Sequence, residues 1–89
     1  MRLDWLEDLV ALLDARSLTD AAALHNVSQP AFTRRLRAAE AALGTRLLDR
    51  AVRPVRPRTG ALALAPRLRE AALEIRQLRL AAEEESGSR

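Results

Sequence analysis

Apolar residues recur at three- and four-residue intervals in four stretches of the chain, which predicts helices over residues 3–16, 18–25, 28–43 and 59–84. The first helix has a broad apolar stripe made of Leu6, Leu9, Val10 and Leu13. The second is short, and its inner face carries only small side chains, so that two helix axes can approach closely there. The chain is therefore predicted to be mostly α.

Capping residues mark the limits of these helices. Ser17 and Ser28 are expected N-caps, with Thr19 as an alternative to Ser17, because a hydroxyl can accept a hydrogen bond from a free N–H of the first turn. Gly44 is expected to end the third helix. Between the second and third helices, His25 and Asn26 form a break, and asparagine tolerates the left-handed conformation that a tight turn needs. Two helices so joined predict a helix-turn-helix.

The third helix has two contrasting faces. Its apolar stripe consists of Phe32, Leu36, Ala39 and Leu43. At about 100° per residue, the opposite side presents Pro30, Thr33, Arg34 and Arg37. A helix that buries one side and offers hydroxyl and guanidinium groups on the other suits the major groove of DNA, although a lone helix of this kind is more often a solvated surface helix.

Residues 45–58 break the helical pattern. Leu47 and Leu48 are predicted to form one short strand and residues 52–56 a second, while the prolines suit an edge hairpin. We interpret this segment as a β-wing whose tip region carries arginines, at positions Arg50, Arg53, Arg56 and Arg58. Such a hairpin beside a helix-turn-helix is placed to reach phosphates or an adjacent minor groove.

The last helix carries a heptad seam rather than a broad apolar face. The seam residues are Leu64, Leu68, Ala71, Ile75, Leu78 and Ala82. We expect a homodimer through the first five of them; the alternative is that the first half packs within the chain and the second half frays. Pro66 either kinks this helix or makes it start later. Residues 1–58 are thus predicted to form the first domain, 59–84 a linker helix and 85–89 a disordered tail or linker.

The charge of the chain is unevenly distributed. Between Arg34 and Arg69 there are ten arginines and two acidic residues, a local charge of +8, whereas the remaining residues sum to −5 and the whole to +3. A block as one-sided as this is typical of a polyanion-binding surface.

The composition makes several other classes unattractive. The chain has no Cys or Tyr and a single His, so we expect no metal site, no cofactor and no enzymatic activity. No apolar run approaches the roughly 20 residues of a spanning helix, and the acidic N-terminal stretch does not look like a secretory signal, so a cytoplasmic protein is expected.

Two motifs carry a resemblance to a known family. Residues 21–36 match AA-x-LH-x-VSQPA-x-[ST]R-x-[IL], and residues 40–50 match E-x-x-LG-x-x-L-[FL]-x-R. With the order of elements, they make the chain resemble the N-terminal DNA-binding domain of LysR-type transcriptional regulators over almost its whole length. Two departures are Leu48, where many members have Phe, and Arg58 at the usual cap position of the linker helix, with Thr59 as the alternative cap.

The resemblance implies a winged helix-turn-helix followed by a linker helix that dimerises in antiparallel fashion, with tetramers of full-length regulators as a further option. It also implies DNA contacts by Gln29, Pro30, Thr33 and Arg34 and by wing residues Arg50, Arg53 and Pro54. Effectors of the family bind a large C-terminal domain that these 89 residues do not contain.

From the residues and the resemblance together we expect sequence-specific binding of double-stranded DNA at an operator. Arg34 is expected to bind a guanine and Gln29 an adenine or a phosphate. Four residues are expected to hold the DNA backbone: Ser28, Arg35, Arg50 and Arg53. The main alternative is a helical dimerisation or protein-interaction module that uses the heptad seam; membrane-surface binding is weaker, because the basic stretch is not an amphipathic helix.

Overall fold

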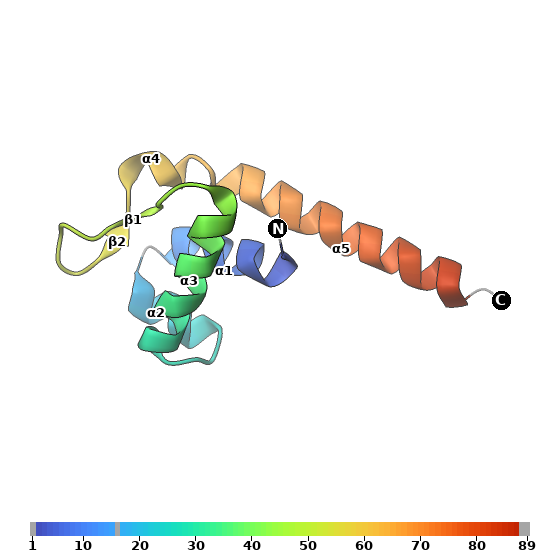
Figure 1. Ribbon diagram of the computed structural model, residues 1–89, viewed down its shortest axis with the longest axis horizontal. Helices are drawn as coiled ribbons and strands as arrows, with labels where there is room; N and C mark the ends of the chain where they lie inside the picture. The colour runs from blue at the N-terminus through green and yellow to red at the C-terminus, as the bar shows by residue number, and fades with distance from the viewer. Residues whose placement is uncertain (1, 16, 88–89) are drawn as a thin grey trace.

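The computed structural model describes residues 2–15 and 17–87, and within them a bundle of helices with a small two-stranded sheet. The elements follow in the order α1 (Leu3–Ala15), α2 (Leu18–Leu24), α3 (Gln29–Leu43), β1 (Leu48–Asp49), β2 (Arg56–Pro57), α4 (Thr59–Leu62) and α5 (Ala65–Gly87). Helix α5 projects away from the rest (Figure 1), which makes the molecule 54 × 25 × 20 Å in extent. Arg16, the predicted last residue of the first helix, lies outside the described residues.

The helix boundaries follow the capping residues that the sequence indicated. The hydroxyl of Ser17 accepts from the backbone N–H of Asp20, and that of Ser28 from Ala31, at 3.1 and 3.3 Å. Gly44 ends α3 with a φ of +89°, and Asn26 turns the chain between α2 and α3 with a φ of +59°. These predictions are confirmed. The features could be predicted because each depends on interactions within four residues along the chain.

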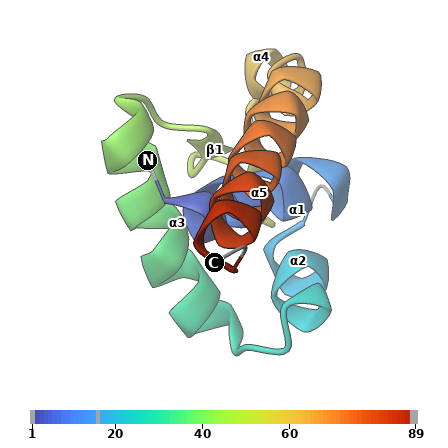
Figure 2. The same ribbon diagram turned by 90° about the vertical axis from the view of Figure 1, so that its right-hand side faces the viewer.

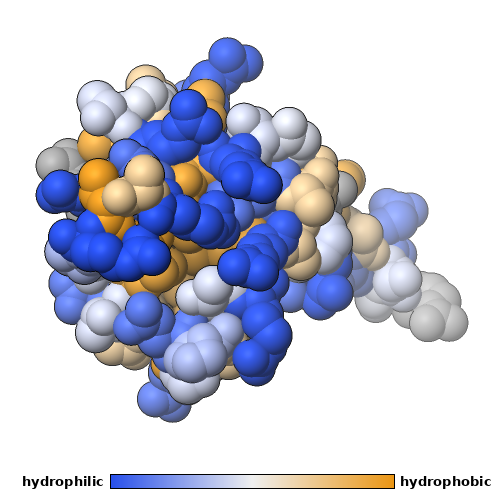
Figure 3. Space-filling view, turned by 60° about the vertical axis from the view of Figure 1, so that its left-hand side comes forward, coloured by the Kyte–Doolittle hydropathy of each residue, from blue (hydrophilic) through white to orange (hydrophobic). Residues whose placement is uncertain are grey.

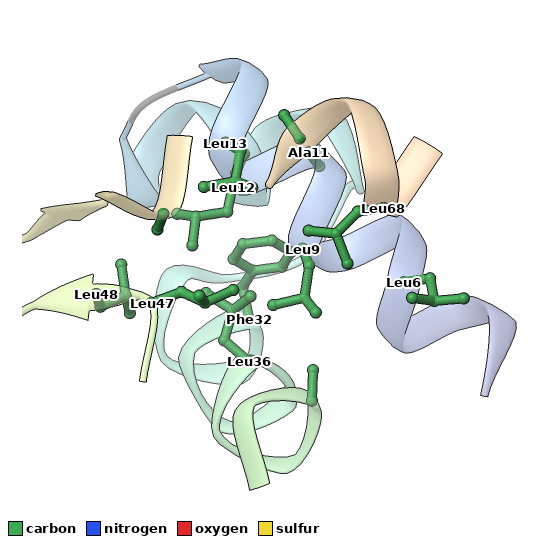
Figure 4. Close-up of a cluster of buried hydrophobic side chains, with 14 of the residues drawn as sticks. Leu6, Leu9, Ala11, Leu12, Leu13, Phe32, Leu36, Leu47, Leu48 and Leu68 are labelled. Atoms are coloured by element: carbon green, nitrogen blue, oxygen red, sulfur yellow. The ribbon is translucent and has the colours of Figure 1, made fainter. Parts of the chain in front are cut away.

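The core lies where α1, α3 and the start of the wing meet. Leu9, Leu12, Phe32, Leu36 and Leu47 are all fully buried, and their side chains converge (Figure 4). Helix α1 is the central element, since it packs against α2, α3 and α5. Figure 2 shows α5 in front of α1, with α3 and α2 on either side.

The wing is a short antiparallel ladder with Leu48 opposite Pro57 and Asp49 opposite Arg56. The second strand was predicted over residues 52–56, but β2 begins only at Arg56. Before it, the chain passes through an irregular turn that contains Pro54. Leu48, at the position where many members of the resembling family have Phe, has a buried side chain. Proline is tolerated at position 57 because a two-stranded sheet has only edges.

The predicted linker helix is divided in two. Helix α4 follows Arg58, which occupies the N-cap without a side-chain hydrogen bond, so Thr59 is not the cap. Helix α5 starts at Ala65, with Pro66 in its first turn, where the missing N–H costs nothing; the later start is therefore confirmed. The expected disordered tail was wrong for residues 85–87, which continue α5, while Ser88 and Arg89 lie outside the described residues.

The heptad seam of α5 is largely used within the chain. Leu68 is buried in the core at 6% exposure, and Leu64 and Ile75 pack against that core, whereas Ala71 and Leu78 are exposed. The prediction that all five residues face a second copy therefore needs correction for Leu68, because α1 already covers it. Heptad spacing alone does not distinguish a neighbouring helix of the same chain from one of another chain.

Two ion pairs reinforce the packing of α5 on α1. The guanidinium of Arg69 pairs with Asp14, and that of Arg76 pairs with Glu7. All four side chains are at least partly exposed, so each pair contributes little to stability individually. They add to the apolar packing of α5 on α1, which includes the buried Leu68 and Ala72.

Candidate nucleic-acid interface

Helix α3 buries one face and exposes the face that was predicted to meet DNA. Phe32, Leu36 and Ala39 are completely buried against the core. On the opposite side Gln29, Pro30, Arg34 and Arg37 are exposed and Thr33 is half-buried. The structure therefore brings together on one solvent-facing surface the amide, hydroxyl and guanidinium groups that the sequence placed there.

Arg34 and Arg37 keep their charges available. Within the described part of the chain, neither guanidinium forms an ion pair with a carboxylate. Both project from the same exposed side of α3, one turn apart along the helix. An unpaired arginine on such a surface has all five N–H donors free for a base edge or a phosphate.

Gln29, at the start of α3, is held by the preceding helix. The hydroxyl of Thr19 in α2 donates to the side-chain oxygen of Gln29 at 3.0 Å. This hydrogen bond assigns the orientation of the amide. The NH₂ group of Gln29 is then free to donate to an acceptor other than Thr19. Helix α2 thus contributes to the presentation of a residue on α3, which is how the first helix of a helix-turn-helix supports the second.

The arginines of the wing are arranged by short internal contacts. One NH₂ group of Arg50 donates to Glu40 of α3 at 2.9 Å, and Arg53 donates to the backbone carbonyls of Arg50 and Val52 at 2.7 and 3.1 Å. Pro54 follows on the exposed turn. These contacts leave other donors of both arginines directed to solvent, but they also restrict how far each side chain can reach.

Glu40 is a residue whose role the sequence analysis missed. Its side chain is largely buried, and Oε2 accepts from the backbone N–H groups of Leu47 and Leu48 at 2.6 and 3.2 Å. Burial raises the pKa of this carboxyl, but the hydrogen bond from Arg50, those from the two N–H groups and the positive charge of Arg50 outweigh it, so the pKa is below its ordinary value. Glu40 therefore stays ionised and ties the wing to α3.

Arg35 is placed differently from the other arginines of α3. Its guanidinium is directed to the side of the helix and binds Asp8, a buried residue of α1, through two hydrogen bonds of 2.9 and 2.5 Å. Nothing in the local sequence indicated this pair, because the partners are 27 residues apart. The available signal was Asp8 itself, an acidic residue directly before Leu9 in the apolar stripe of α1.

An open hollow of about 530 Å³ separates the end of α3 from the wing. It is bordered by Arg37, Arg46 and Arg50 together with Glu40, Ala41, Gly44 and Thr45. Hydrophilic side chains cover much of this side of the molecule, with apolar patches between them (Figure 3). The positive groups at the rim suit a phosphate-rich ligand, although Glu40 neutralises part of the charge of Arg50.

Among residues 2–15 and 17–87, no three His, Asp or Glu side chains converge in a way that would hold a metal ion. The same residues contain no helix with the length and apolar character required to span a bilayer.

Comparison with known proteins identifies the family of this chain. A family model described as "Bacterial regulatory helix-turn-helix protein, lysR family" matches residues 3–59, from the start of α1 to the start of α4. The chain belongs to the LysR family. Its winged helix-turn-helix is the DNA-binding domain of this family, and the resemblance found in the sequence motifs is thereby confirmed.

Individual members of the LysR family are similar over different lengths. The HTH-type transcriptional regulator YjiE of Escherichia coli K12 is 49% identical over 51 residues, which are 57% of this chain and 17% of that protein. DarR of Vibrio fischeri, solved in complex with DNA, superposes with a TM-score of 0.79 at 30% identity, over 97% of this chain and 30% of DarR. The chain therefore spans less than a third of the length of these two relatives.

A domain of the same size has also been solved in complex with DNA. The CbnR_DBD–DNA complex has a protein chain that matches with a TM-score of 0.72 and 30% identity, and the match covers all of both chains. The arrangement of winged helix-turn-helix and long helix in this LysR-family chain is thus shared by a DNA-binding domain over its entire length.

Proposed function

We propose that this LysR-family domain recognises an operator in double-stranded DNA as the DNA-reading part of a transcriptional regulator. The observation that carries the proposal is the exposed side of α3, where free guanidinium groups stand beside an amide and a hydroxyl while the opposite side is anchored in the core. Base edges in the major groove are read by these groups. DarR and CbnR_DBD, which share the fold, were solved bound to DNA.

In this proposal Arg34 makes the principal base contact. Its guanidinium has the two parallel donors that match O6 and N7 of guanine. Thr33 and Pro30 offer apolar contact to a thymine methyl group, and the Thr33 hydroxyl a hydrogen bond. Gln29, with its oxygen occupied by Thr19, presents its NH₂ group to an acceptor such as adenine N7 or a phosphate.

The DNA backbone would be held around this reading surface. Ser28 lies at the start of α3, Arg37 lies near its middle, and Arg50 and Arg53 lie on the wing. Such contacts set the register of the domain on the duplex without reading sequence. The wing arginines would approach with the donors that their internal hydrogen bonds leave free.

Operator binding by two copies would extend recognition to two half-sites, about one or two helical turns apart. The exposed side of α5 supports a homodimer, because Leu73, Leu78 and Leu80 are exposed along it although they are large and apolar. The protein would act in the cytoplasm, without enzymatic activity of its own. An effector would bind a further domain of the full-length regulator.

Selection of duplexes from a random pool, followed by binding measurements at increasing salt, tests this function. We expect enrichment of one sequence, and a fall of log affinity against log salt with a slope near −5 if about six phosphates are neutralised. A scrambled duplex of the same length is the control. A protein that enriches no sequence, or that dimerises without shifting duplex DNA, would instead support the interaction-module alternative.

A further inference from the structure

Asp8 of α1 is an acidic residue that is fully buried, and it contacts two segments of the helix-turn-helix. Its side chain has 0% exposure. Oδ2 accepts from Nε of Arg35 at 2.9 Å, and Oδ1 accepts from the terminal NH₂ of Arg35 at 2.5 Å. Nδ1 of His25, in the turn between α2 and α3, lies 3.0 Å from Oδ1.

Two of these side chains, those of Arg35 and His25, also contact the buried aromatic ring of Phe32. The guanidinium carbon of Arg35 lies 5.9 Å from the centre of the Phe32 ring, and the His25 ring meets Phe32 edge-on at 5.6 Å. Because Nδ1 of His25 is closer to Asp8 than to Arg35, we assign a proton to it, and it donates to the carboxylate. The cluster is therefore complete, with donors on both carboxylate oxygens.

This arrangement restricts α3 more than apolar packing does. A carboxylate and a guanidinium joined by two parallel hydrogen bonds must stay nearly coplanar, so rotation or sliding of α3 on α1 breaks at least one bond. Breaking the pair would leave the buried carboxylate with His25 as its remaining side-chain donor, which is unfavourable. Arg35 directly follows Arg34, so the rotation that Asp8 fixes is also the rotation that aims Arg34 and Thr33.

We propose that Asp8 is a positioning residue that sets the specificity of DNA reading by fixing the orientation of α3 through Arg35 and His25. Arg35 is then part of this support and makes no phosphate contact, although its place among the arginines of α3 suggested one. The inference rests on the proposed function. It concerns the ratio between affinities for operator and unrelated DNA.

The decisive variant is Asp8→Asn, because it makes the protein more basic. If Asp8 acted only through charge, both specific and non-specific binding would become tighter. The positioning role predicts the opposite for the operator: about tenfold weaker binding to the selected duplex, the scale of one lost base contact, with unchanged or tighter binding to the scrambled duplex. Loss of folded protein alone would lower both affinities equally and leave their ratio unchanged.

A second variant covers the case in which Asp8→Asn does not fold. The double substitution Asp8→Leu with Arg35→Met removes both charges and leaves no buried ion unpaired, which is often neutral or stabilising. We expect it to melt no lower than the unsubstituted protein in circular dichroism and still to lose specificity. A double variant with the original specificity ratio would overturn the proposal.

The salt dependence separates Arg35 from a true phosphate contact. Arg37 is an exposed arginine on the same helix, and Arg37→Gln should reduce the slope of log affinity against log salt by about 0.9 on both duplexes. Arg35→Gln should leave the slope on the scrambled duplex unchanged, and a reduction equal to that of Arg37→Gln would contradict the positioning role. If the unsubstituted protein does not distinguish the two duplexes, the proposed function fails. If it does, and Asp8→Asn keeps the ratio while circular dichroism shows the variant to be folded, only this inference fails.

Discussion

Glu40 and Arg50 join the recognition helix to the wing, with Oε1 of the carboxylate 2.9 Å from an NH₂ group of the guanidinium. The second carboxylate oxygen binds the N–H groups of Leu47 and Leu48, where the chain enters the wing. A single side chain of α3 thus satisfies three donors of the following segment. The position of the wing arginines therefore depends on the charge of Glu40.

Replacement of Glu40 by Gln should destabilise the domain by about 1–3 kcal/mol, because a charged acceptor is exchanged for a neutral one that also brings a buried NH₂ group. Thermal unfolding measures the change. The contribution of Glu40 to the stability of the domain should also depend on pH. The pKa of Glu40 is lowered in the folded state, so this contribution is fully present above the unfolded pKa near 4.5. It is lost as the pH falls through the folded pKa. Glu40→Gln should lose that part of the acid sensitivity, and an unchanged pH profile of unfolding would contradict the assignment.

Substitution of Arg34 by Ala should cost about 1–3 kcal/mol of operator affinity and relax the preference at one base pair. The reason is that a bidentate base contact is lost while α3 keeps its place. Binding to the selected duplex, to single-base variants of it and to a scrambled duplex measures the effect. Equal losses on all duplexes would show that Arg34 contacts only phosphate.

Gly44 should tolerate substitution less well than Gly60, although a Cβ at either position would meet no atom within 4 Å. Gly44 has a φ of +89°, so Gly44→Ala should destabilise the domain by about 1 kcal/mol through backbone strain alone. Gly60 lies in helix α4, and Gly60→Ala should be neutral or stabilising. Chemical unfolding of both variants compares them, and equal effects would mean that the αL turn after α3 is unimportant.

Leu78→Asp should weaken a homodimer without destabilising the domain, because Leu78 is 66% exposed on the projecting part of α5. Ile75→Asp is the contrasting variant: Ile75 packs against the core of its own chain, so a charge there should lower the melting temperature as well. Sedimentation gives the oligomeric state and circular dichroism the stability. Unchanged sedimentation of Leu78→Asp at all concentrations would remove this residue from the interface.

Features set by neighbouring residues could be predicted from the sequence. The serine caps, the glycine stop and the turn at Asn26 depend on contacts within a few positions, and the exposed side of α3 follows from helical spacing. The spacing of apolar and polar positions in α3 is therefore sufficient to place Thr33 and Arg34 on a common surface.

Features set by distant partners were beyond the sequence. Asp8 and Arg35 are 27 positions apart, so their pairing depends on the tertiary fold and cannot be deduced from the spacing of either residue. The seam of α5 illustrates the same limit, since Leu68 has the spacing of a dimer contact but is covered by the core of its own chain. Spacing along one helix shows which residues share a side, but the element that covers this side depends on the tertiary fold.

The ion pairs of Arg69 and Arg76 with α1 have a geometric consequence for an assembled regulator. Helix α5 packs on α1, and α1 contacts α3 through Asp8, so a movement of α5 together with α1 would carry the helix-turn-helix and the wing with it. In a dimer built through α5, the crossing angle of the two helices would then determine the distance between the two heads. A change of this angle would alter which operator spacing fits, without any rearrangement inside either domain.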